Sequence, residues 1–470
     1  MSSKLAKEEF VSGHNGTSLG EIYLLTATLI AGYLLRCVLI VCLPSGLKKS
    51  TIVSFLLDYS TIIVPGVLVF TILADYTLYV LGFIITASVL VALVHLSSSN
   101  ASISSRFKNL FKLMYPTRLP CVTLTRTFVT LITAIAILAV DFQIYPRRLA
   151  KAETFGTGLM DVGVGAFIMS HGITAPEARG KSGGRVIVST LRGLLPLIVI
   201  GVLRLLAVKG TDYQEHVTEY GVHWNFFFTI AAVRLLATLL HPVLCVRPGL
   251  YGVASLLTAV VYQLALSELG LSYYIQHGPY GDGSRPTLLS ANREGLWSCV
   301  GYLAIYLGHI EIGKWLFKPR KSLLNYVSVL GSLLCLFCVF YCLTVLCSGY
   351  IEPISRRLVN LAYITWIFSY GALIVGLFLL TDVIVSTLSH TSQVPRPHSL
   401  HSASVCLISA VDYNQLSFFL LANLFTGLVN FSMDTLSVSW ITGLVILLAY
   451  MAVLSFVFCT LYKFNIKIKL

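Results

Sequence analysis

Long apolar runs alternate with short polar breaks along almost the whole sequence. A hydrocarbon core about 30 Å thick requires roughly 20 apolar residues per helix, and runs of about this length recur from residue 22 to residue 462. One of them, 51–73, is interrupted by Asp58 and Pro65. The pattern predicts about thirteen transmembrane helices, near 22–43, 51–73, 77–96, 122–140, 155–174, 187–208, 224–244, 250–267, 297–317, 324–347, 358–381, 414–433 and 439–462.

Composition supports this interpretation. Of the 470 residues, 56% are hydrophobic and 11% are charged, and the mean hydropathy is +0.83. A soluble protein carries roughly 25% charged residues. We therefore predict an all-α polytopic membrane protein with one multi-pass domain over residues 1–470, a lumenal tail at 1–21 and a cytoplasmic loop at 382–413. The tail contains Glu8 and Glu9 and does not resemble a cleaved signal peptide.

Basic residues distinguish the two membrane faces. Lys and Arg concentrate in the predicted loops around 48–49, 106–118, 179–185 and 318–321 and at the carboxyl terminus. The positive-inside rule places this face in the cytosol, so we expect a lumenal amino terminus and a cytoplasmic carboxyl terminus. Asn15 begins a glycosylation sequon on the lumenal tail. Because the basic residues do not cluster on a soluble face, we expect no nucleic-acid partner.

The stretch 140–165, VDFQIYPRRLAKAETFGTGLMDVGVG, concentrates charge at the lumenal edge between the fourth and fifth predicted spans. Asp141 ends the first of these spans and Lys151 opens the second. A carboxylate at such an edge can act as a general base, and a nearby cation can stabilise developing negative charge. These two residues are therefore our candidates for catalysis.

The same stretch contains further charged residues. Arg147 and Arg148 are candidates for binding a phosphate, because the guanidinium group matches its geometry. The alternative is that these charges anchor the protein at lipid headgroups. Asp161 lies inside the following apolar run, where a carboxylate is costly unless it is paired or faces water, so it is also a candidate.

Polar side chains also flank other spans on the lumenal face, and the predicted lumenal loops carry more carboxylates than the cytoplasmic loops. Such a concentration suggests a polar site on that face, although ordinary hydrophilic loops are the alternative. Interhelical hydrogen bonding is the alternative for each residue taken alone. The remaining substrate-binding candidates are His223 and Asn225 in EYGVHWN, Asn292 and Arg293 in SANREG, and Arg356 in SRRLVN.

Two other patterns are weaker. His277 and Asp282, in HGPYGD, have the spacing of a glycerolipid-acyltransferase dyad, but a single match in a glycine-rich loop has little specificity. Cys335, Cys338 and Cys342 share one helix face, yet no second cluster completes four ligands. We therefore expect no metal site.

Several segments of ten or more residues resemble the glycosylphosphatidylinositol (GPI) inositol acyltransferase family, called PIG-W in animals. They occur in order from the fourth to the twelfth predicted span, so the resemblance covers essentially the whole chain. They are the stretch 140–165, EYGVHWNFFFT, SANREGLWS with GYLAIYLG, SRRLVNLAYITW and NQLSFFLLANLFTGLVN.

The resemblance implies transfer of a fatty acyl chain, usually palmitoyl, from acyl-CoA to the inositol 2-hydroxyl of glucosaminyl-phosphatidylinositol. It implies Asp141 and Lys151 as the catalytic pair, thirteen spans and residence in the endoplasmic reticulum membrane. No bound cofactor is expected, and the partners are the two substrates and membrane lipids. A multi-pass transporter of a lipid or small solute is the alternative function, since Asp161, Glu311 and Lys314 lie inside apolar runs. A non-catalytic scaffold is a third interpretation.

Overall fold

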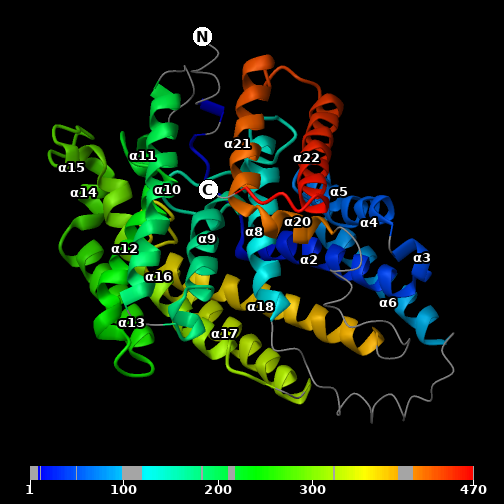
Figure 1. Cartoon of the computed structure of the whole chain (residues 1–470). Helices are drawn as coiled ribbons and strands as arrows, with labels where there is room; N and C mark the ends of the chain where they lie inside the picture. The colour runs from blue at the N-terminus through cyan, green and yellow to red at the C-terminus, as the bar shows by residue number, and fades with distance from the viewer. Residues whose placement is uncertain are drawn as a thin grey trace. The chain divides into compact units, whose positions relative to one another are not determined.

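The computed structural model describes residues 9–10, 12–48, 50–97, 119–181, 184–209, 217–320, 323–389 and 406–468. These residues form helices and connecting loops, together with one isolated parallel bridge between Gly16 and Thr157 (Figure 1). Among them, eleven helical segments are long and apolar enough to cross a membrane. The prediction of an all-α polytopic membrane protein is therefore confirmed. The segments are Leu19–Cys42, Thr51–Val69, Ala74–Ser97, Pro120–Ala139, Ile187–Leu206, Phe226–Leu244, Leu250–Glu268, Leu324–Tyr350, Leu361–Leu388, Gln415–Ser432 and Trp440–Lys463.

Two of the thirteen expected spans are not among these segments. The expected span 155–174 is a loop, a short 3-10 turn and the helix α9 (Val162–Ile173), which has only 12 residues. The expected span 297–317 lies in α16 (Arg293–Leu316), which is long enough but contains five charged or histidine side chains. Both helices are nevertheless mostly buried, since protein rather than lipid surrounds them.

Helices cluster into two compact units, each built from several parts of the sequence. Unit 1 contains residues 1–17, 150–318 and 335–372, and unit 2 contains 18–149, 319–334 and 373–470. The helices α17 (Leu323–Tyr350) and α18 (Leu361–Ser389) contribute residues to both units. Whether the chain acts as one domain stays a prediction.

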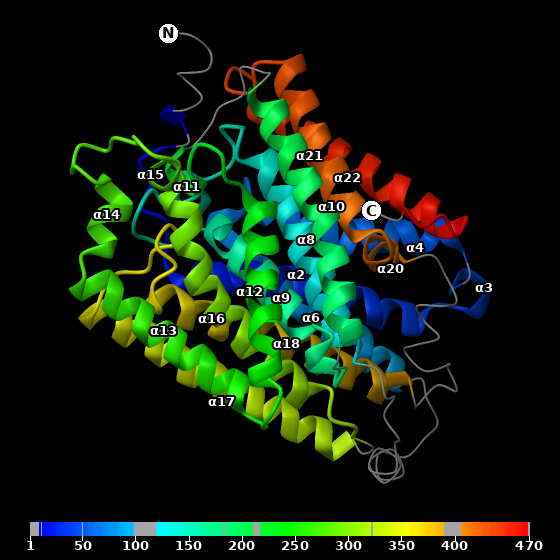
Figure 2. The same cartoon turned by 60° about the vertical axis from the view of Figure 1, so that its left-hand side comes forward.

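In unit 1, α16 is the central helix and contacts α9, α12 (Phe226–Leu244) and α13 (Leu250–Glu268), as Figure 2 shows. The helix α10 (Gly184–Lys209) packs against α12. Small residues allow the close approach of α16: added side-chain carbon atoms at Gly308 and Gly313 would collide with Phe368 and with the Ile173 carbonyl. The shorter elements of this unit are α11 (Val217–Tyr220), α14 (Leu271–His277) and α15 (Leu288–Ala291).

In unit 2, α2 (Leu19–Cys42) packs against α6 (Thr77–Ser97), and α8 (Pro120–Ala139) packs against α20 (Leu407–Tyr413) and α21 (Gln415–Ser432). The last helix, α22 (Trp440–Lys463), contacts α20 and α21. Ser18 and Ser439 accept hydrogen bonds from the first turns of α2 and α22, and each therefore caps the start of its helix.

The interruption that the sequence predicts in segment 51–73 occurs in the structure. A π-helical turn, Tyr59–Ile63, separates α4 (Thr51–Asp58) from α5 (Val64–Val69). Asp58 is fully buried, accepts a hydrogen bond from Arg36 Nε at 2.6 Å and accepts another from the Leu407 amide at 2.6 Å. This charge in an apolar segment is therefore paired within unit 2.

The predicted loop 382–413 begins and ends with helical residues in the structure. Helix α18 continues to Ser389, because its last turns still bury Val385 and Leu388, and α20 begins at Leu407. Residues 390–405 lie outside the described part of the chain, as do Glu8 of the tail and the basic residues of 106–118. The orientation of the two termini stays a prediction.

Candidate active site

The loop 351–360, between α17 and α18, carries two consecutive arginines, Arg356 and Arg357. Ser355 Oγ donates to the Thr154 carbonyl, and the Gly156 amide donates to the Ile354 carbonyl at 2.8 Å. These bonds hold the loop against the segment that follows Lys151.

The same loop contains a strained residue. Val359 has a φ of 50°, which is rare for a β-branched residue and costs free energy unless packing enforces it. Its carbonyl lies so close to α16 that a side-chain carbon at Gly301 would overlap it. Glycine at 301 therefore permits the contact that fixes this end of the loop.

Arg356 belongs to a group of two cations and two carboxylates, which we call the neutral cluster: Lys151, Asp161, Glu219 and Arg356. Asp161 and Arg356 are buried, and Lys151 and Glu219 are partly exposed. Arg356 Nε donates to Asp161 Oδ1 at 2.8 Å, and Nη1 donates to Glu219 Oε1 at 3.3 Å. Lys151 Nζ donates to both Glu219 oxygens, at 2.9 and 2.7 Å. Each charge in the cluster therefore has an opposite charge beside it.

Asp161 is completely buried, and both of its carboxylate oxygens accept hydrogen bonds from other residues. Besides the bond from Arg356, Oδ2 accepts the amides of Ala152 at 3.0 Å and Gly158 at 2.7 Å. The Tyr363 hydroxyl donates to the Asp161 carbonyl at 2.8 Å. A carboxylate bonded in this way fixes the backbone after Lys151 and positions Arg356.

Glu219 connects the two cations of the neutral cluster. Burial alone would raise the pKa of Glu219, but Lys151 and Arg356, with a smaller contribution from Arg204, lower it to about 2. Burial alone would likewise lower the pKa of Arg356, yet Glu219 and Asp161 raise it. Glu219 and Arg356 are therefore charged at neutral pH, whereas burial raises the pKa of Asp161 against the opposing effect of Arg356.

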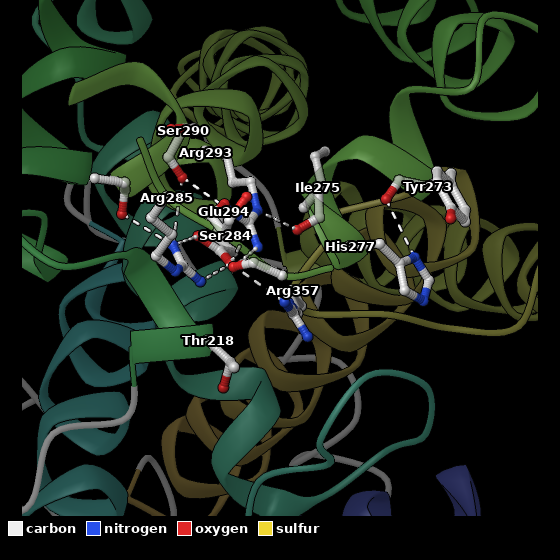
Figure 3. Close-up of polar contacts among 12 residues, drawn as sticks. Thr218, Tyr273, Ile275, His277, Ser284, Arg285, Ser290, Arg293, Glu294 and Arg357 are labelled. Atoms are coloured by element: carbon white, nitrogen blue, oxygen red, sulfur yellow. Dashed lines mark hydrogen bonds and ion pairs between the residues drawn. The ribbon is translucent and has the colours of Figure 1, made fainter. Parts of the chain in front are cut away.

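Arg357 belongs to a second group, which we call the cationic cluster: Arg285, Arg293, Glu294 and Arg357 (Figure 3). Glu294 is completely buried at its centre. Arg285 forms a bidentate pair with it, Nη2 to Oε1 at 2.6 Å and Nη1 to Oε2 at 3.0 Å, and Arg357 Nη2 donates to Oε1 at 3.2 Å. Arg293 Nε lies 3.7 Å from the same oxygen.

Arg293 is buried and holds a neighbouring loop. Its Nε donates to the Ile275 carbonyl at 2.9 Å, and its Nη1 donates to the carbonyls of Ser284 and Ser290, each at 3.1 Å. Burial lowers the pKa of Arg293; Glu294 raises it, and the neighbouring arginines lower it further. The cationic cluster thus concentrates three positive charges around one carboxylate.

The candidates His223, Asn225 and Asn292 lie in the same unit and take part in hydrogen bonds that hold the local structure. Asn225 caps α12: its Oδ1 accepts the amides of Phe227 and Phe228, and its Nδ2 donates to the Gly201 carbonyl. Asn292 Oδ1 accepts the His223 amide at 2.7 Å. These bonds position α12 and the start of α16, and a role in substrate binding stays a prediction.

Asp141 and Lys151 belong to different units. In unit 2, Asp141 follows α8 and is buried, and its Oδ2 accepts a hydrogen bond from Asn430 Nδ2 of α21 at 2.7 Å. In unit 1, the Lys151 side chain is 37% exposed and is held by Glu219. The catalytic role of the pair stays a prediction.

The two predicted phosphate-binding arginines of unit 2 have other partners. Arg147 donates to three backbone carbonyls of residues 140–145, and burial lowers its pKa to about 10. Arg148 is paired with Glu21 and Asp75. A phosphate would have to compete with the two carboxylates for Arg148.

His277 and Asp282, the residues of the alternative dyad, each contact a neighbour close in the sequence. The His277 ring stacks on Tyr273 with ring centroids 4.4 Å apart, on the far side of Ile275 from the cationic cluster in Figure 3. Asp282 accepts the Ser284 amide at 2.9 Å and so closes its own turn. Within the described residues, no group of three or more His, Cys, Asp or Glu side chains is arranged to hold a metal ion.

Comparison with known proteins identifies the family. A family model described as GWT1 matches residues 3–461. The chain belongs to the GWT1 family. The resemblance expected from the sequence is therefore confirmed.

Proteins from animals and fungi are similar to most of the chain. The Bos taurus protein named glucosaminyl-phosphatidylinositol-acyltransferase PIGW is 36% identical over an alignment of 488 residues that covers 96% of each chain. Its Homo sapiens counterpart is 34% identical over an alignment of 500 residues that again covers 96% of each chain. A protein of *Aspergillus fumigatus* named GPI-anchored wall transfer protein 1 is 39% identical over 372 residues, 74% of this chain and 73% of that one.

Sequence reasoning did not select Glu219, Glu294 or Arg357 as site residues. Each one lies within a segment that carried the family resemblance, next to or near a residue that was selected. The missing information was spatial: a loop carboxylate has no distinguishing pattern until its partners on other elements are known.

Proposed function

We propose that this chain transfers an acyl group to the inositol of glucosaminyl-phosphatidylinositol. The observation that carries this proposal is the similarity to proteins named for that activity over 96% of the chain. The buried charged clusters of unit 1 suit an enzyme that binds a charged lipid, and the family similarity favours catalysis over a transporter or a scaffold.

We further propose acyl-CoA, with palmitoyl as its acyl chain, as the donor, and the endoplasmic reticulum membrane as the location. Both proposals rest on the family resemblance. A thioester is already activated toward an alcohol, so the reaction requires no bound cofactor. The hydroxyl oxygen attacks the thioester carbonyl, a carbon–oxygen bond forms, the carbon–sulfur bond breaks, and coenzyme A leaves as a thiol after gaining a proton.

Asp141 is the proposed general base. A buried carboxylate that accepts a hydrogen bond from Asn430 is held in a defined orientation, and a carboxylate placed in this way can take the proton of the inositol hydroxyl as the hydroxyl attacks. Asn430 is then a positioning residue.

Lys151 is proposed to stabilise the oxyanion that forms on the thioester carbonyl. An ammonium group has three N–H donors, and the two hydrogen bonds of Lys151 within the described residues both go to Glu219. Glu219 thereby orients the Lys151 ammonium, which stays partly exposed and retains a donor for a developing negative charge.

The test is acyl transfer by purified variants with labelled acyl-CoA and glucosaminyl-phosphatidylinositol. Asp141→Asn keeps the size of the side chain and its bond with Asn430 but removes the base, so turnover should fall by about 100-fold or more. Lys151→Ala should cause a similar loss. The double variant should lose little more than the worse single variant, because residues that act as a unit are not additive.

Asp282→Asn is the matched control, since it alters an exposed carboxylate of the alternative dyad and should leave turnover unchanged. Near-normal turnover of both Asp141→Asn and Lys151→Ala, at normal abundance of folded protein, would show that the reaction uses other residues. Loss of turnover in Asp282→Asn alone would favour the dyad.

A further inference from the structure

We propose that Arg357 binds a phosphate group of a substrate, with Arg285 and Arg293 supporting it through Glu294. This inference rests on the proposed function, because that function supplies two phosphate-bearing substrates. It assigns phosphate recognition to the cationic cluster and not to Arg147 and Arg148.

Charge balance is the first argument. Three guanidinium groups surround Glu294, so the cationic cluster has two positive charges in excess. Arg293 and Glu294 are buried and Arg285 is mostly buried, so water screens this excess weakly. Asp282 also lies near Arg293, but it is exposed and its charge is screened. A bound anion would neutralise this excess positive charge.

Unused hydrogen-bond donors are the second argument. Arg357 is 8% exposed, and its one hydrogen bond within the described residues runs from Nη2 to Glu294. Its Nε is buried and has no partner among those residues. A buried donor without a partner is costly, so it calls for a ligand that accepts. In Figure 3 the remainder of this guanidinium points away from Arg285 and Arg293.

The geometry of the surrounding backbone is the third argument. The loop 351–360 is held rigidly: Arg356 anchors it in the neutral cluster, and Val359 adopts a strained φ. Strain of this kind is typical of ligand-binding segments. On the other side, Arg293 holds the loop 278–284, whose residues 279–283 are exposed, so the cationic cluster borders the molecular surface.

Phosphate is the anion that fits these donors. A guanidinium group presents its N–H donors as a planar fork and binds two phosphate oxygens at once, with hydrogen bonds stronger than those between neutral groups. Two sources have this chemistry: the phosphodiester of the acceptor lipid and the phosphates of coenzyme A. The experiment distinguishes them.

The kinetic experiment uses the full-length protein purified in lipid nanodiscs, with each substrate varied while the other is saturating. Arg357→Gln should raise the KM of one substrate by about 10-fold or more, which corresponds to the loss of a charge-assisted pair, and should change kcat by less than about threefold. The substrate whose KM rises is the source of the phosphate. Arg357→Lys should restore part of the affinity that Arg357→Gln loses, because it keeps the positive charge but lacks the planar N–H donors of the guanidinium group.

Arg247→Gln is the matched control, since it removes an exposed arginine of the same unit outside the cluster and should leave both KM values unchanged. If both KM values of Arg357→Gln stay within twofold of the parent protein, the proposal is overturned. If Arg357→Gln does not fold, Arg357→Lys decides: a KM raised threefold or more supports the proposal, and unchanged values overturn it.

A binding experiment separates this inference from the proposed function. Glycerophosphoinositol and free coenzyme A carry the two kinds of phosphate and need no acyl transfer, and binding of each is measured by thermal stabilisation of the parent protein and of Arg357→Gln. Stabilisation that Arg357→Gln abolishes supports the subsite even if the parent protein transfers no acyl group. Stabilisation that persists in Arg357→Gln overturns the subsite and leaves the proposed function intact.

Discussion

Two neighbouring arginines of one loop lie in opposite electrostatic surroundings. Arg356 enters a cluster in which two cations face two carboxylates, whereas Arg357 enters a cluster in which three cations share one carboxylate. The residue type is the same and the burial is similar, and the balance of cations and carboxylates differs. The comparison shows that the partners of a buried arginine decide its role. Its N–H groups can be taken up by structural ion pairs, or some of them can stay available for a ligand.

The difference has an energetic consequence. Breaking a balanced buried pair leaves a charge without compensation, which is strongly destabilising. Removing one cation from an overcharged cluster relieves repulsion while the carboxylate keeps its other partners. The variants below test whether the two clusters differ in this way.

The largest effect is expected for Arg356→Gln. The variant leaves Asp161 completely buried without a cation, so the free energy of unfolding should fall by about 3–5 kcal/mol, as measured by SDS titration in mixed micelles. The double variant Asp161→Asn with Arg356→Gln should recover part of this loss, because the uncompensated carboxylate is gone. A loss below about 1 kcal/mol in the single variant would mean that water already enters the neutral cluster.

A smaller effect is expected for Gly301→Ala. The added methyl group would overlap the Val359 carbonyl and displace the loop that carries both arginines. The same titration should show a loss of about 1–3 kcal/mol, typical of overpacking. Gly331→Ala is the control, because its α17 position has open space around it and should be neutral or slightly stabilising. Equal stability of the two variants would show that the loop is not fixed at Val359.

Arg357→Gln should change the free energy of unfolding by less than about 1 kcal/mol, in contrast to the neighbouring Arg356→Gln. Glu294 keeps its bidentate pair with Arg285, and the variant removes one of three mutually repelling cations. The two variants alter adjacent residues of the same loop and should be measured together. Similar losses in both would remove the distinction between the clusters.

Lys151→Met is expected to have the smallest effect on stability, and the effect should appear at acidic pH. The pKa of Glu219 is lowered to about 2, so its stabilising contribution is complete above the ordinary carboxyl pKa and is lost as the pH falls toward about 2. Removing Lys151 raises this folded-state pKa toward the ordinary carboxyl value, so the contribution of Glu219 becomes smaller and the variant should lose less stability than the parent protein as the pH falls. Thermal melting between pH 7 and pH 3 measures this shift in the acid response.

Lys314→Met is the control for this last variant, because Lys314 pairs with Glu311 elsewhere in unit 1 at 3.8 Å. It should leave the acid response of the protein unchanged. The same shift in both variants would show that loss of net positive charge, and not the pairing with Glu219, causes the change.

Apolar spans were predictable because their signal is local. A run such as 324–347 contains about 20 apolar residues whatever the rest of the chain does, and it forms the helix α17. The prediction was less accurate for α9 and α16. A short helix and a helix with charged residues can both lie inside the protein, where length and hydropathy do not decide their position.

The candidate site was only partly predictable for the same reason. Arg356 and Asp161 were both selected from their own surroundings in the sequence, but their pairing joins residues 195 positions apart. Asn225 was selected as a polar residue before a span, and in the structure its side chain is the cap of α12. Local sequence shows that a polar group needs a partner and does not show which partner it has.

The sequence by itself determined the class of the protein, its family and most of its membrane-spanning helices. These properties depend on residue composition and on ordered motifs, which are read along the chain. Tertiary structure alone decided that Arg356 is neutralised and that Arg357 keeps free donors. The reason is physical: the energy of a buried charge depends on the carboxylates within a few ångströms, and helices distant in sequence supply them.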